Sequence, residues 1–592
     1  MKSVDYEQVI ASTFDFYKSA TNLKEAYLRS IDLGDGFSLI PVSRFHCADG
    51  RLISNMAAWR NRFVTAYPTQ FKATPDSTSR WLDESVLNQP GRILFLVMDK
   101  CGCCFGHIGF NNCINNERSF EIDNVVRGEA GYPGLFSRAL DILCTWAYET
   151  FPVDDIVLRV MADNSRAIDF YYSLGWSLVR EIQLTKRESK DFVSYEEAQS
   201  EDQSNSTDGA MLLLRYNQAT DIGERMILTA GPSISAMESS FAFDAASRGW
   251  NSNWSGYLNA FENEFAAYVG VKYALATSSC TGALHIALVA LGVGPGDEVI
   301  VPDQTWVATA KAVQYAGAKP VFADVELDTW NLDIAAVKKK ITSRTKAIIP
   351  VHMYGHPARM DQIMAVAREH GLYVVEDAAP AIGAEWKGQR CGSFGDFACF
   401  SFQGAKLLVT GEGGMLVTSN RRLYERAKKV WDQGRNPAKV FWIDDQGLKY
   451  KMSNVQAAVG LAQLRRVDGL IAMKRRLFSW YKEGLLGLPG IRLNEEILGA
   501  RSIYWMTSVF LDETIETSRD DLIGRLKVRN IDTRPVFPAI SQYPIWGVDH
   551  DSQPTAMLIG DRAMNLPSGV CLKKHEVDHI CQVIREELDG EG

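Results

Sequence analysis

The 592-residue sequence predicts an α/β protein built from more than one domain, and three observations support this class. The chain is too long for one ordinary core, because single cores stop growing at roughly 250–300 residues. From about residue 226 onward, short apolar runs alternate with helical patterns, which is typical of a mainly parallel sheet. Between about 183 and 208 the chain becomes polar, which predicts an exposed loop. We place a domain boundary near 218–226.

Composition and charge weigh against several classes of protein. A net charge of −9 is mild for this length and argues against nucleic acid or an anionic membrane as a partner. The eleven cysteines are scattered, and Cys101, Cys103 and Cys104 have poor spacing for metal ligands, so we expect no metal site. The start lacks a secretory pattern, and the most apolar run, 273–294, is interrupted by polar residues. We therefore expect a reduced, cytoplasmic protein without a membrane span.

The first domain is expected over residues 36–217, after a helical N-terminal extension over 1–35 whose amphipathic pattern predicts that it packs on a domain. The run ILFLVMDKCGCCFGHIGF, at 93–110, predicts two strands joined by a turn. A last strand is expected at 209–217, directly after the polar stretch.

A second, larger domain is expected over residues 226–470, followed by a smaller C-terminal subdomain over 471–592, where the pattern loosens. Strand-like and helical runs alternate through the large domain as YALATS, TGALHIALVAL, EVIVPD, ATAKAVQYAG, PVFADV, KAIIPVHMY, MDQIMAVAREH and LYVVEDAA. In open sheets of this kind, ligands gather at the carboxyl ends of the strands. Chemistry is therefore expected in the segments that follow these strands.

One lysine of the large domain stands in an unusual setting. In SFQGAKLLVTGEGGM, Lys406 lies between Ser401 and a glycine-rich cluster at 411–414, and apolar residues lead in from Phe397. Burial among apolar neighbours lowers the pKa of a lysine and frees its amine to attack a carbonyl carbon. A surface lysine requires no such surroundings.

Two further features supply partners for this lysine. Asp377 ends a strand-like run, although a strand-end acid taken alone is typically a solvated surface group. The small-residue loop 279–282 precedes a helix, and such a loop exposes backbone amides to a phosphate. An amine, an acid and a phosphate cradle are together the three contacts that pyridoxal phosphate (PLP) requires.

Motifs in fixed order over residues 226–592 resemble the DegT/DnrJ/EryC1/StrS family of nucleotide-sugar aminotransferases. The stretches that carry the resemblance include SSCTGALHIALVALGVGPGDEVIVPDQTWVATA, PVHMYGH, VVEDAAPAIGAEWKG, SFGDFACFSFQGAKLLVTGEGGM and GLKYKMSNVQAAVGLAQL. The resemblance implies the aspartate-aminotransferase fold, fold type I, with PLP as cofactor. It also implies at least a homodimer, because this fold type builds each site at a dimer interface.

The resemblance implies roles for individual residues. Lys406 falls on the lysine that bonds the PLP aldehyde, and Asp377 on the partner of the ring nitrogen. Trp306 lies where the family stacks an aromatic ring on the cofactor, although an ordinary core tryptophan is the alternative. The phosphate is expected to meet the backbone of Cys280 and Thr281 and the hydroxyl of Ser401.

One position departs from the family pattern. Many relatives place asparagine in a segment that reaches the phosphate across the dimer interface, whereas this chain has Lys449 in GLKYK. An ammonium could contact the same phosphate as a point charge, or Lys449 could face solvent, and the sequence leaves both open. The family's dehydratase branch, which carries histidine in place of the lysine at 406, is disfavoured.

The first domain carries a second set of motifs. Arg127, Gly128, Gly131 and Gly134 precede an apolar-periodic helix, and glycines there let the backbone approach a pyrophosphate. Taken alone, this loop reads as a plain strand–helix turn.

The later stretch NSRAIDFYYSLGW resembles the NxxAxxFYxxxGF ending of the Gcn5-related N-acetyltransferases (GNAT), an α+β family, over roughly residues 36–217. The resemblance implies acetyl-CoA as co-substrate, a contact from Asn164, and Tyr171 as the acid that protonates the departing thiolate. The phosphate loop is looser than the family pattern. His107 and Glu121 are candidates for a base on the acceptor side, and we assign neither.

The two motif sets in one chain predict a bifunctional enzyme. An aminotransferase would place an amine from glutamate on a nucleotide-linked keto-deoxy sugar, and an acetyltransferase would cap that amine, for a surface polysaccharide such as O-antigen. The alternative is an aminotransferase alone, acting on a sugar or a cyclitol, with a non-catalytic acyltransferase-like module in front. An aromatic amine precursor is a further possible substrate.

Overall fold

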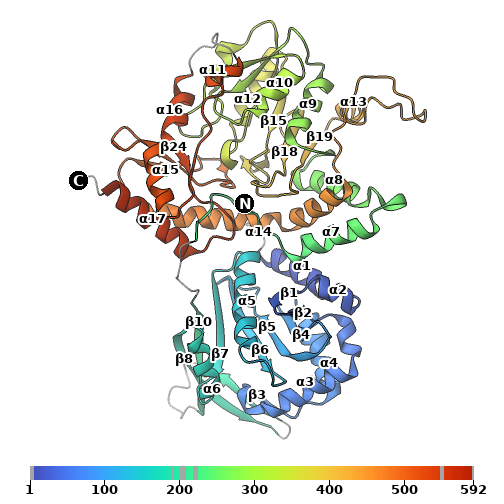
Figure 1. Cartoon of the computed structure of the whole chain (residues 1–592), viewed down its shortest axis with the longest axis vertical. Coiled ribbons are helices and arrows are strands. Elements are labelled where there is room, and N and C mark those ends of the chain that lie inside the picture. The colour runs from blue at the N-terminus through green and yellow to red at the C-terminus, as the bar shows by residue number, and fades with distance from the viewer. Residues whose placement is uncertain (1–5, 190–191, 199–207, 218–224, 547–552, 590–592) are drawn as a thin grey trace. The chain divides into compact units, whose positions relative to one another are not determined.

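The computed structural model describes residues 6–189, 192–198, 208–217, 225–546 and 553–589 (Figure 1). Contacts between residues divide the chain into two compact units. The first contains the described residues up to 217 together with Ser235–Ser240, and the second contains 225–234 and the chain from Phe241 onward.

The first unit is built on one ten-stranded sheet, in the order β1-β2-β4-β5-β6-β7-β10-β8-β9-β3. Only β6 and β7 pair in parallel; the other neighbours are antiparallel. The β6–β7 pairing stops at Ile122 and Leu158, so the rest of β6 pairs with β5 alone. The strands are β1 Ile31–Gly34, β2 Phe37–Pro41, β3 Thr69–Gln70, β4 Ile93–Asp99, β5 Cys104–Asn111, β6 Ser119–Arg127, β7 Asp155–Met161, β8 Trp176–Glu188, β9 Val193–Glu197 and β10 Gly209–Tyr216.

Helices cover this sheet and close its core. They are α1 Tyr6–Lys18, α2 Leu23–Leu28, α3 Gly50–Arg62, α4 Pro75–Trp81, α5 Leu135–Thr150 and α6 Ser165–Ser173, with a π-helical turn at Leu82–Leu87. The N-terminal helix α1 is part of the core, since Tyr17 stacks edge-on against Trp146 of α5 at 5.4 Å. The range 1–35 is thus not purely helical, because it ends in the edge strand β1.

The polar stretch 183–208 differs from its prediction. Instead of a loop, its described part continues β8 to Glu188 and then forms β9, which pairs antiparallel with β8. Most of its side chains are exposed. The polar composition therefore predicted solvent exposure correctly. It did not predict that the backbone N–H and C=O groups would find hydrogen-bond partners by strand pairing. The two strands predicted at 93–110 and the last strand at 209–216 are confirmed.

The second unit is centred on a seven-stranded sheet in the order β11-β19-β18-β15-β14-β12-β13. Only β19 runs against the others, so the carboxyl ends of the remaining strands meet at one edge. Its strands are β11 Tyr273–Thr277, β12 Glu298–Pro302, β13 Lys319–Ala323, β14 Thr345–Ile348, β15 Tyr373–Asp377, β18 Phe397–Ser401 and β19 Gly414–Thr418. The mainly parallel α/β domain predicted from the alternating pattern is confirmed.

Two smaller sheets complete this unit. One is β17-β16-β21, and the other, β20-β22-β24-β23, belongs to the C-terminal part. Their strands are β16 Glu385–Trp386, β17 Gln389–Arg390, β20 Ile491–Leu493, β21 Ala500–Arg501, β22 Ser508–Leu511, β23 Arg534–Pro535 and β24 Ala563–Asn565.

The long helix α14, Asn454–Gly484, connects the large and C-terminal parts of this unit. Its first half packs in the core of the large part, and Leu477 and Tyr481 pack in that of the C-terminal part. The expected boundary at 470 therefore lies inside one unbroken helix. The other helices are α8 Gly256–Val269, α9 Cys280–Leu291, α10 Ala308–Tyr315, α11 Ile334–Lys340, α12 Met360–His370, α13 Arg421–Trp431, α15 Arg519–Val528, α16 Pro554–Arg562 and α17 Lys574–Asp589. Helix α7, Ala236–Arg248, is divided between the two units after Ser240.

Within the described ranges, none of the helices combines the length and the apolar character needed to span a bilayer. The same residues contain no group of three or more His, Cys, Asp or Glu side chains placed to hold a metal ion.

Candidate active site

Lys406 lies in the segment that joins β18 to β19, five residues after Ser401. Its amine is 3.5 Å from the ring centroid of Trp505, and it interacts electrostatically with Asp377 and Cys280. Burial lowers the pKa of Lys406 to about 8, against the opposing effects of those two groups. An appreciable share of the amine is therefore uncharged near neutral pH, as a nucleophile requires.

Asp377 is the last residue of β15 and is almost completely buried. Its Oδ2 accepts a hydrogen bond from the hydroxyl of Thr309 at 2.7 Å, and its Oδ1 accepts one from the amide of Ala379 at 3.1 Å. Burial raises the pKa of Asp377, while these hydrogen bonds and Lys406 oppose that rise. A cationic ligand group beside this carboxylate would favour its charged form.

The neighbouring acid, Glu376, is fully engaged elsewhere. It is completely buried and accepts a hydrogen bond from Nε2 of His352 at 3.0 Å. It also accepts hydrogen bonds at 2.7–2.8 Å from the amides of Gly392, Phe394 and Gly395. The two acids that end β15 therefore have different roles. Glu376 stabilises the loops around it through hydrogen bonds, whereas Asp377 interacts with Lys406.

The loop before α9 leaves backbone donors open. Ser279 caps the helix by accepting a hydrogen bond from the amide of Gly282 at 3.0 Å. Among the described hydrogen bonds, none uses the amides of Cys280 or Thr281, which lie at the positive end of α9. A Cβ atom on Gly414 would lie 2.6 Å from the amide nitrogen of Cys280, so glycine lets β19 pass close to this loop.

Trp306 and Ser401 lie at the same strand edge. Trp306 is 55% exposed, and its ring centroid is 5.4 Å from that of Phe537. The hydroxyl of Ser401, at the end of β18, accepts a 3.4 Å hydrogen bond from the amide of Gln403. The indole face of Trp306 is thus exposed, and the hydroxyl of Ser401 can still donate a hydrogen bond. Both groups could contact a ligand bound beside Lys406 and Asp377.

These groups match the needs of PLP by their chemistry. The amine of Lys406 suits the aldehyde, the buried carboxylate of Asp377 suits the ring nitrogen, and the amides of Cys280 and Thr281 suit the phosphate. They come from segments far apart in the sequence, and the parallel strands bring them to one edge of the sheet (Figure 1).

Sequence reasoning missed an aromatic row that leads from Trp306 to Lys406. After Phe537 comes Tyr354, whose ring is 5.8 Å from that of Phe537 and nearly parallel to it. Tyr354 is in turn 5.7 Å from Trp505, at an interplanar angle of 21°. Tyr354 lies in the motif PVHMYGH, yet the row was not predicted, because the contacts of Tyr354 with Phe537 and Trp505 join segments about 150–200 positions apart.

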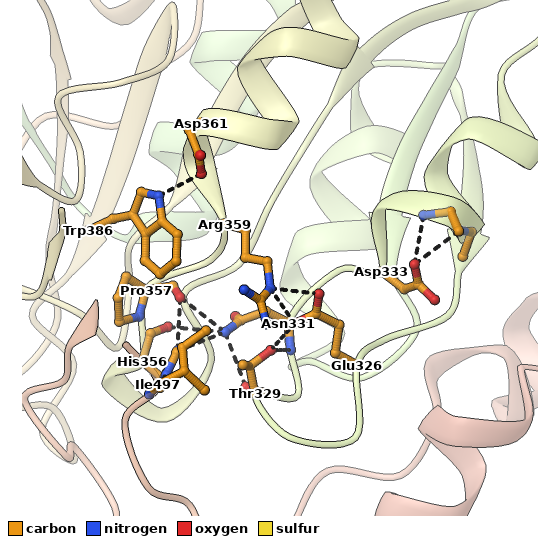
Figure 2. Close-up of polar contacts among 12 residues, drawn as sticks. Glu326, Thr329, Asn331, Asp333, His356, Pro357, Arg359, Asp361, Trp386 and Ile497 are labelled. Carbon is orange, nitrogen blue, oxygen red and sulfur yellow. Dashed lines mark hydrogen bonds and ion pairs between the residues drawn. The ribbon is translucent and has the colours of Figure 1, made fainter. Parts of the chain in front are cut away.

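The segment that carries Tyr354 is held in a left-handed conformation, with φ +48°. Asn331 stabilises this segment, since its Oδ1 accepts a hydrogen bond from the amide of Met353 at 2.9 Å. Figure 2 shows the surrounding network, in which Asn331 donates to the carbonyl of Pro357 and Glu326 accepts from Arg359 at 2.9 Å. These buried contacts compensate the cost of the unusual backbone.

Lys449 is exposed, and none of the described side-chain contacts involves it. Its backbone bridges to Asp432 in the segment between α13 and α14. Nearby, Val440 and Phe441 are more than four-fifths exposed. Whether Lys449 reaches a phosphate of a second copy stays a prediction.

In the first unit, Gly128 makes contacts within the protein itself. Its amide donates to the carbonyl of Phe105 at 2.8 Å, and its carbonyl accepts from Arg62 at 2.8 Å. A Cβ at this position would lie 2.1 Å from the ring of Trp59. The glycine therefore allows Trp59 to pack against the loop, and the expected phosphate contact from Gly128 stays a prediction.

The rest of the predicted phosphate loop is more open. Gly131 and Gly134 have φ values of +137° and +80°, which only glycine adopts freely. Arg127, at the end of β6, is exposed. Within the described hydrogen bonds, six amides ahead of and in the first turn of α5 have no partner: those of Ala130, Gly131, Tyr132, Gly134, Phe136 and Ser137. This arrangement suits a pyrophosphate.

Asn164 directly precedes α6, and Tyr171 lies within this helix. Tyr171 is buried, and burial raises its pKa, so the phenol keeps its proton at neutral pH. Asn164 caps α6 by accepting a hydrogen bond from the amide of Ala167 at 3.3 Å. That contact gives Asn164 a structural use, and its expected contact with a cofactor stays a prediction.

The two candidates for an acceptor-side base differ in availability. His107 is 4% exposed, and its Nδ1 is 2.9 Å from the carbonyl of Asn124, while burial lowers its pKa to about 4. Glu121 forms a 3.3 Å ion pair with Arg159. Neither geometry singles out a base.

Comparisons with known proteins match two families, one in each part of the chain. Residues 232–585 match the DegT/DnrJ/EryC1/StrS aminotransferase family, and residues 46–177 match an acetyltransferase (GNAT) domain. A GDP-perosamine synthase of Caulobacter vibrioides is 41% identical over 365 residues, which are 61% of this chain and 98% of that protein.

Two solved structures show the same fold over the second unit. The Streptomyces venezuelae DesV structure with a ketimine intermediate shares 34% identity at a TM-score of 0.56, and covers 60% of this chain and 95% of its own. The PLP form of the sugar aminotransferase Spr1654 of Streptococcus pneumoniae shares 26% identity at a TM-score of 0.58, and covers 62% and 99%. Most of the chain therefore belongs to the DegT/DnrJ/EryC1/StrS aminotransferase family, with a GNAT domain ahead of it.

Proposed function

We propose that this chain is a bifunctional enzyme that transfers an amino group from glutamate to a nucleotide-linked keto-deoxy sugar and then N-acetylates the product. The observation that carries the first activity is the convergence of Lys406, Asp377 and the open amides of Cys280 and Thr281. The likeness to a GDP-perosamine synthase makes a GDP-linked keto sugar the first substrate to test.

Each residue has a defined task in this proposal. PLP, when bound, supplies an aldehyde that accepts the amino group and a ring that takes up electrons from the broken C–H bond. Lys406 would hold the cofactor through that aldehyde, and its free amine would accept a proton from the donor's α-carbon and give it back. Asp377 keeps the ring nitrogen protonated, and the indole of Trp306 supports the ring plane.

A direct assay tests the aminotransferase. The purified chain is incubated with PLP, glutamate and a panel of GDP-, UDP- and dTDP-linked 3-keto and 4-keto deoxy sugars, and products are read by mass spectrometry. Formation of an amino sugar with at least one member, and its loss in Lys406→Ala, is the expected result. Turnover that survives in Lys406→Ala would remove the basis of the assignment.

The second activity rests on the first unit. The six open amides around the start of α5, and the parting of β6 from β7 beyond Ile122, favour a site for acetyl-CoA. Tyr171 keeps its proton and is placed on α6, so it is the proposed acid for the departing thiolate. The product would be an N-acetylated amino sugar, for a surface polysaccharide.

An aminotransferase with a non-catalytic module in front is the second candidate. One observation favours it, because the amides of Gly128 and Glu129 both donate to Phe105, and Glu129 adds a negative charge to the loop. Calorimetry of the full chain with acetyl-CoA, together with an assay for acetylated sugar, distinguishes the bifunctional enzyme from the aminotransferase with a non-catalytic module. Saturable binding together with acetylated sugar supports the bifunctional enzyme, whereas amino sugar without acetylation supports the module.

We also propose a homodimer that works in a reducing compartment such as the cytosol. The exposed residues Val440 and Phe441, together with Lys449, are the part of the second unit that a partner copy would cover. The described cysteines are free thiols, which suits a reducing compartment. Light scattering of the purified chain tests the dimer.

A further inference from the structure

We propose that Trp505 is a positioning residue for Lys406, whose indole face holds the ε-ammonium group whenever that amine is not bonded to the cofactor. This inference rests on the proposed role of Lys406. It concerns a residue that lies almost 100 positions after the lysine and belongs to none of the motifs identified in the sequence.

The contact itself has the geometry of a cation–π interaction. The amine nitrogen of Lys406 is 3.5 Å from the ring centroid of Trp505, well within the range of about 6 Å over which such contacts act. The titratable groups that interact with this amine are Asp377 at the end of β15 and Cys280 at the start of α9. Trp505 supplies the aromatic face, so charge and ring together define one place for the ammonium.

The indole is fixed on two sides. Its Nε1–H donates to the carbonyl of Ala405, the residue directly before the lysine, at 2.8 Å. Its ring stacks on that of Tyr354 at 5.7 Å. Trp505 is thus hydrogen-bonded to the backbone of the segment that carries Lys406. Its ring cannot rotate away without breaking both contacts.

The backbone of Trp505 is fixed as well. Its carbonyl accepts a hydrogen bond at 2.7 Å from the amine of the buried Lys474 on α14. A Cβ on Gly355 would lie 2.9 Å from the amide nitrogen of Trp505, so the glycine allows this close approach. Tyr504, with φ +48°, turns the chain just before the indole.

This arrangement answers a requirement of the proposed reaction. When the donor displaces Lys406 from the cofactor, a long side chain gains rotamer freedom that would scatter its amine. A fixed indole face beside the amine keeps it within reach for the proton transfer that follows. The interaction favours the ammonium form, and therefore opposes the lowering of its pKa by burial.

The test measures the titration of Lys406 in the full-length chain after PLP has been removed. The pH dependence of its modification by an amine-reactive reagent is read by peptide mass spectrometry in the wild type, Trp505→Leu and Trp505→Phe. We expect the midpoint to fall by about one pH unit in Trp505→Leu. Trp505→Phe keeps a ring with a weaker face, so its midpoint should lie between the two.

Trp386→Leu is the matched control. Trp386 is also a buried tryptophan of the second unit whose Nε1 donates a hydrogen bond, here to Asp361 at 2.7 Å, and it does not contact Lys406. Its variant should lose stability without moving the midpoint. A midpoint in Trp505→Leu or Trp505→Phe that equals or exceeds the wild-type value would overturn the proposal, provided that circular dichroism shows folded protein.

The same measurement separates this inference from the proposed function. If the wild-type chain neither binds PLP nor transfers amino groups, the proposed function fails, yet the Lys406 midpoint is still measurable. If the wild-type chain is active and the midpoint does not respond to Trp505, only the positioning role fails.

Discussion

Gly414→Ala should weaken PLP binding through a clash that the structure locates atom by atom. The added Cβ would lie 2.6 Å from the amide nitrogen of Cys280 and 2.6 Å from the carbonyl carbon of Ser279. Both are backbone atoms, which cannot swing aside as a side chain would. The strain is relieved most directly by moving the loop whose amides are proposed to hold the phosphate.

The expected magnitude follows from the cost of overpacking. Extra atoms in a well-packed site cost about 1–3 kcal/mol. Since about 1.4 kcal/mol corresponds to tenfold in a binding constant, the PLP dissociation constant should rise roughly 5- to 150-fold. Titration of the PLP-free chain with PLP, followed by absorbance, measures this change.

Gly404→Ala is the matched control, because Gly404 lies on the connection that leads from β18 to Gly414 and its added Cβ meets nothing nearer than 3.8 Å. It should bind PLP like the wild type. If Gly414→Ala were folded and bound PLP within about twofold of the wild type, the loop would tolerate the displacement and the proposed phosphate site would be wrong.

Three other outcomes are expected. Lys406→Ala should lose the visible absorbance of bound PLP and all amino transfer, since Lys406 is the amine that interacts electrostatically with Asp377; retained turnover would contradict the assignment. The rate at which PLP condenses with the PLP-free chain should rise with pH through about 8 and then level off, because only the uncharged amine of Lys406 reacts; a flat stopped-flow profile would argue against it. Tyr171→Phe should slow acetyl transfer by about 10²–10⁴-fold and leave amino transfer unchanged, as coupled assays of both products would show.

Much of the aminotransferase site was predictable because its parts lie in contiguous motifs. Lys406, Asp377 and the loop at Cys280 each carry a local signature, and a parallel sheet gathers strand ends without further information. Trp505 carried no such signature, and the motif around Tyr354 did not predict their contact, because it depends on how the C-terminal part folds onto the large sheet.

The first unit shows what local patterns leave out. Gly128 is predicted as a phosphate-loop glycine, and the pattern does not reveal that Trp59, about 70 positions earlier, packs against it. Asn164 is predicted as a cofactor contact, and the pattern does not reveal that its side chain accepts a hydrogen bond from the amide of Ala167. Both contacts within the protein depend on the folded structure, which a motif does not record.

Tyr354 keeps a left-handed backbone, with φ +48°, although glycine or asparagine would suit that conformation better. Either replacement would also remove a buried ring that lies between Phe537 and Trp505. Emptying such a site costs about 3–5 kcal/mol, against about 1–3 kcal/mol of backbone strain. We therefore expect a selection for heat resistance and a selection for catalysis to keep the same tyrosine.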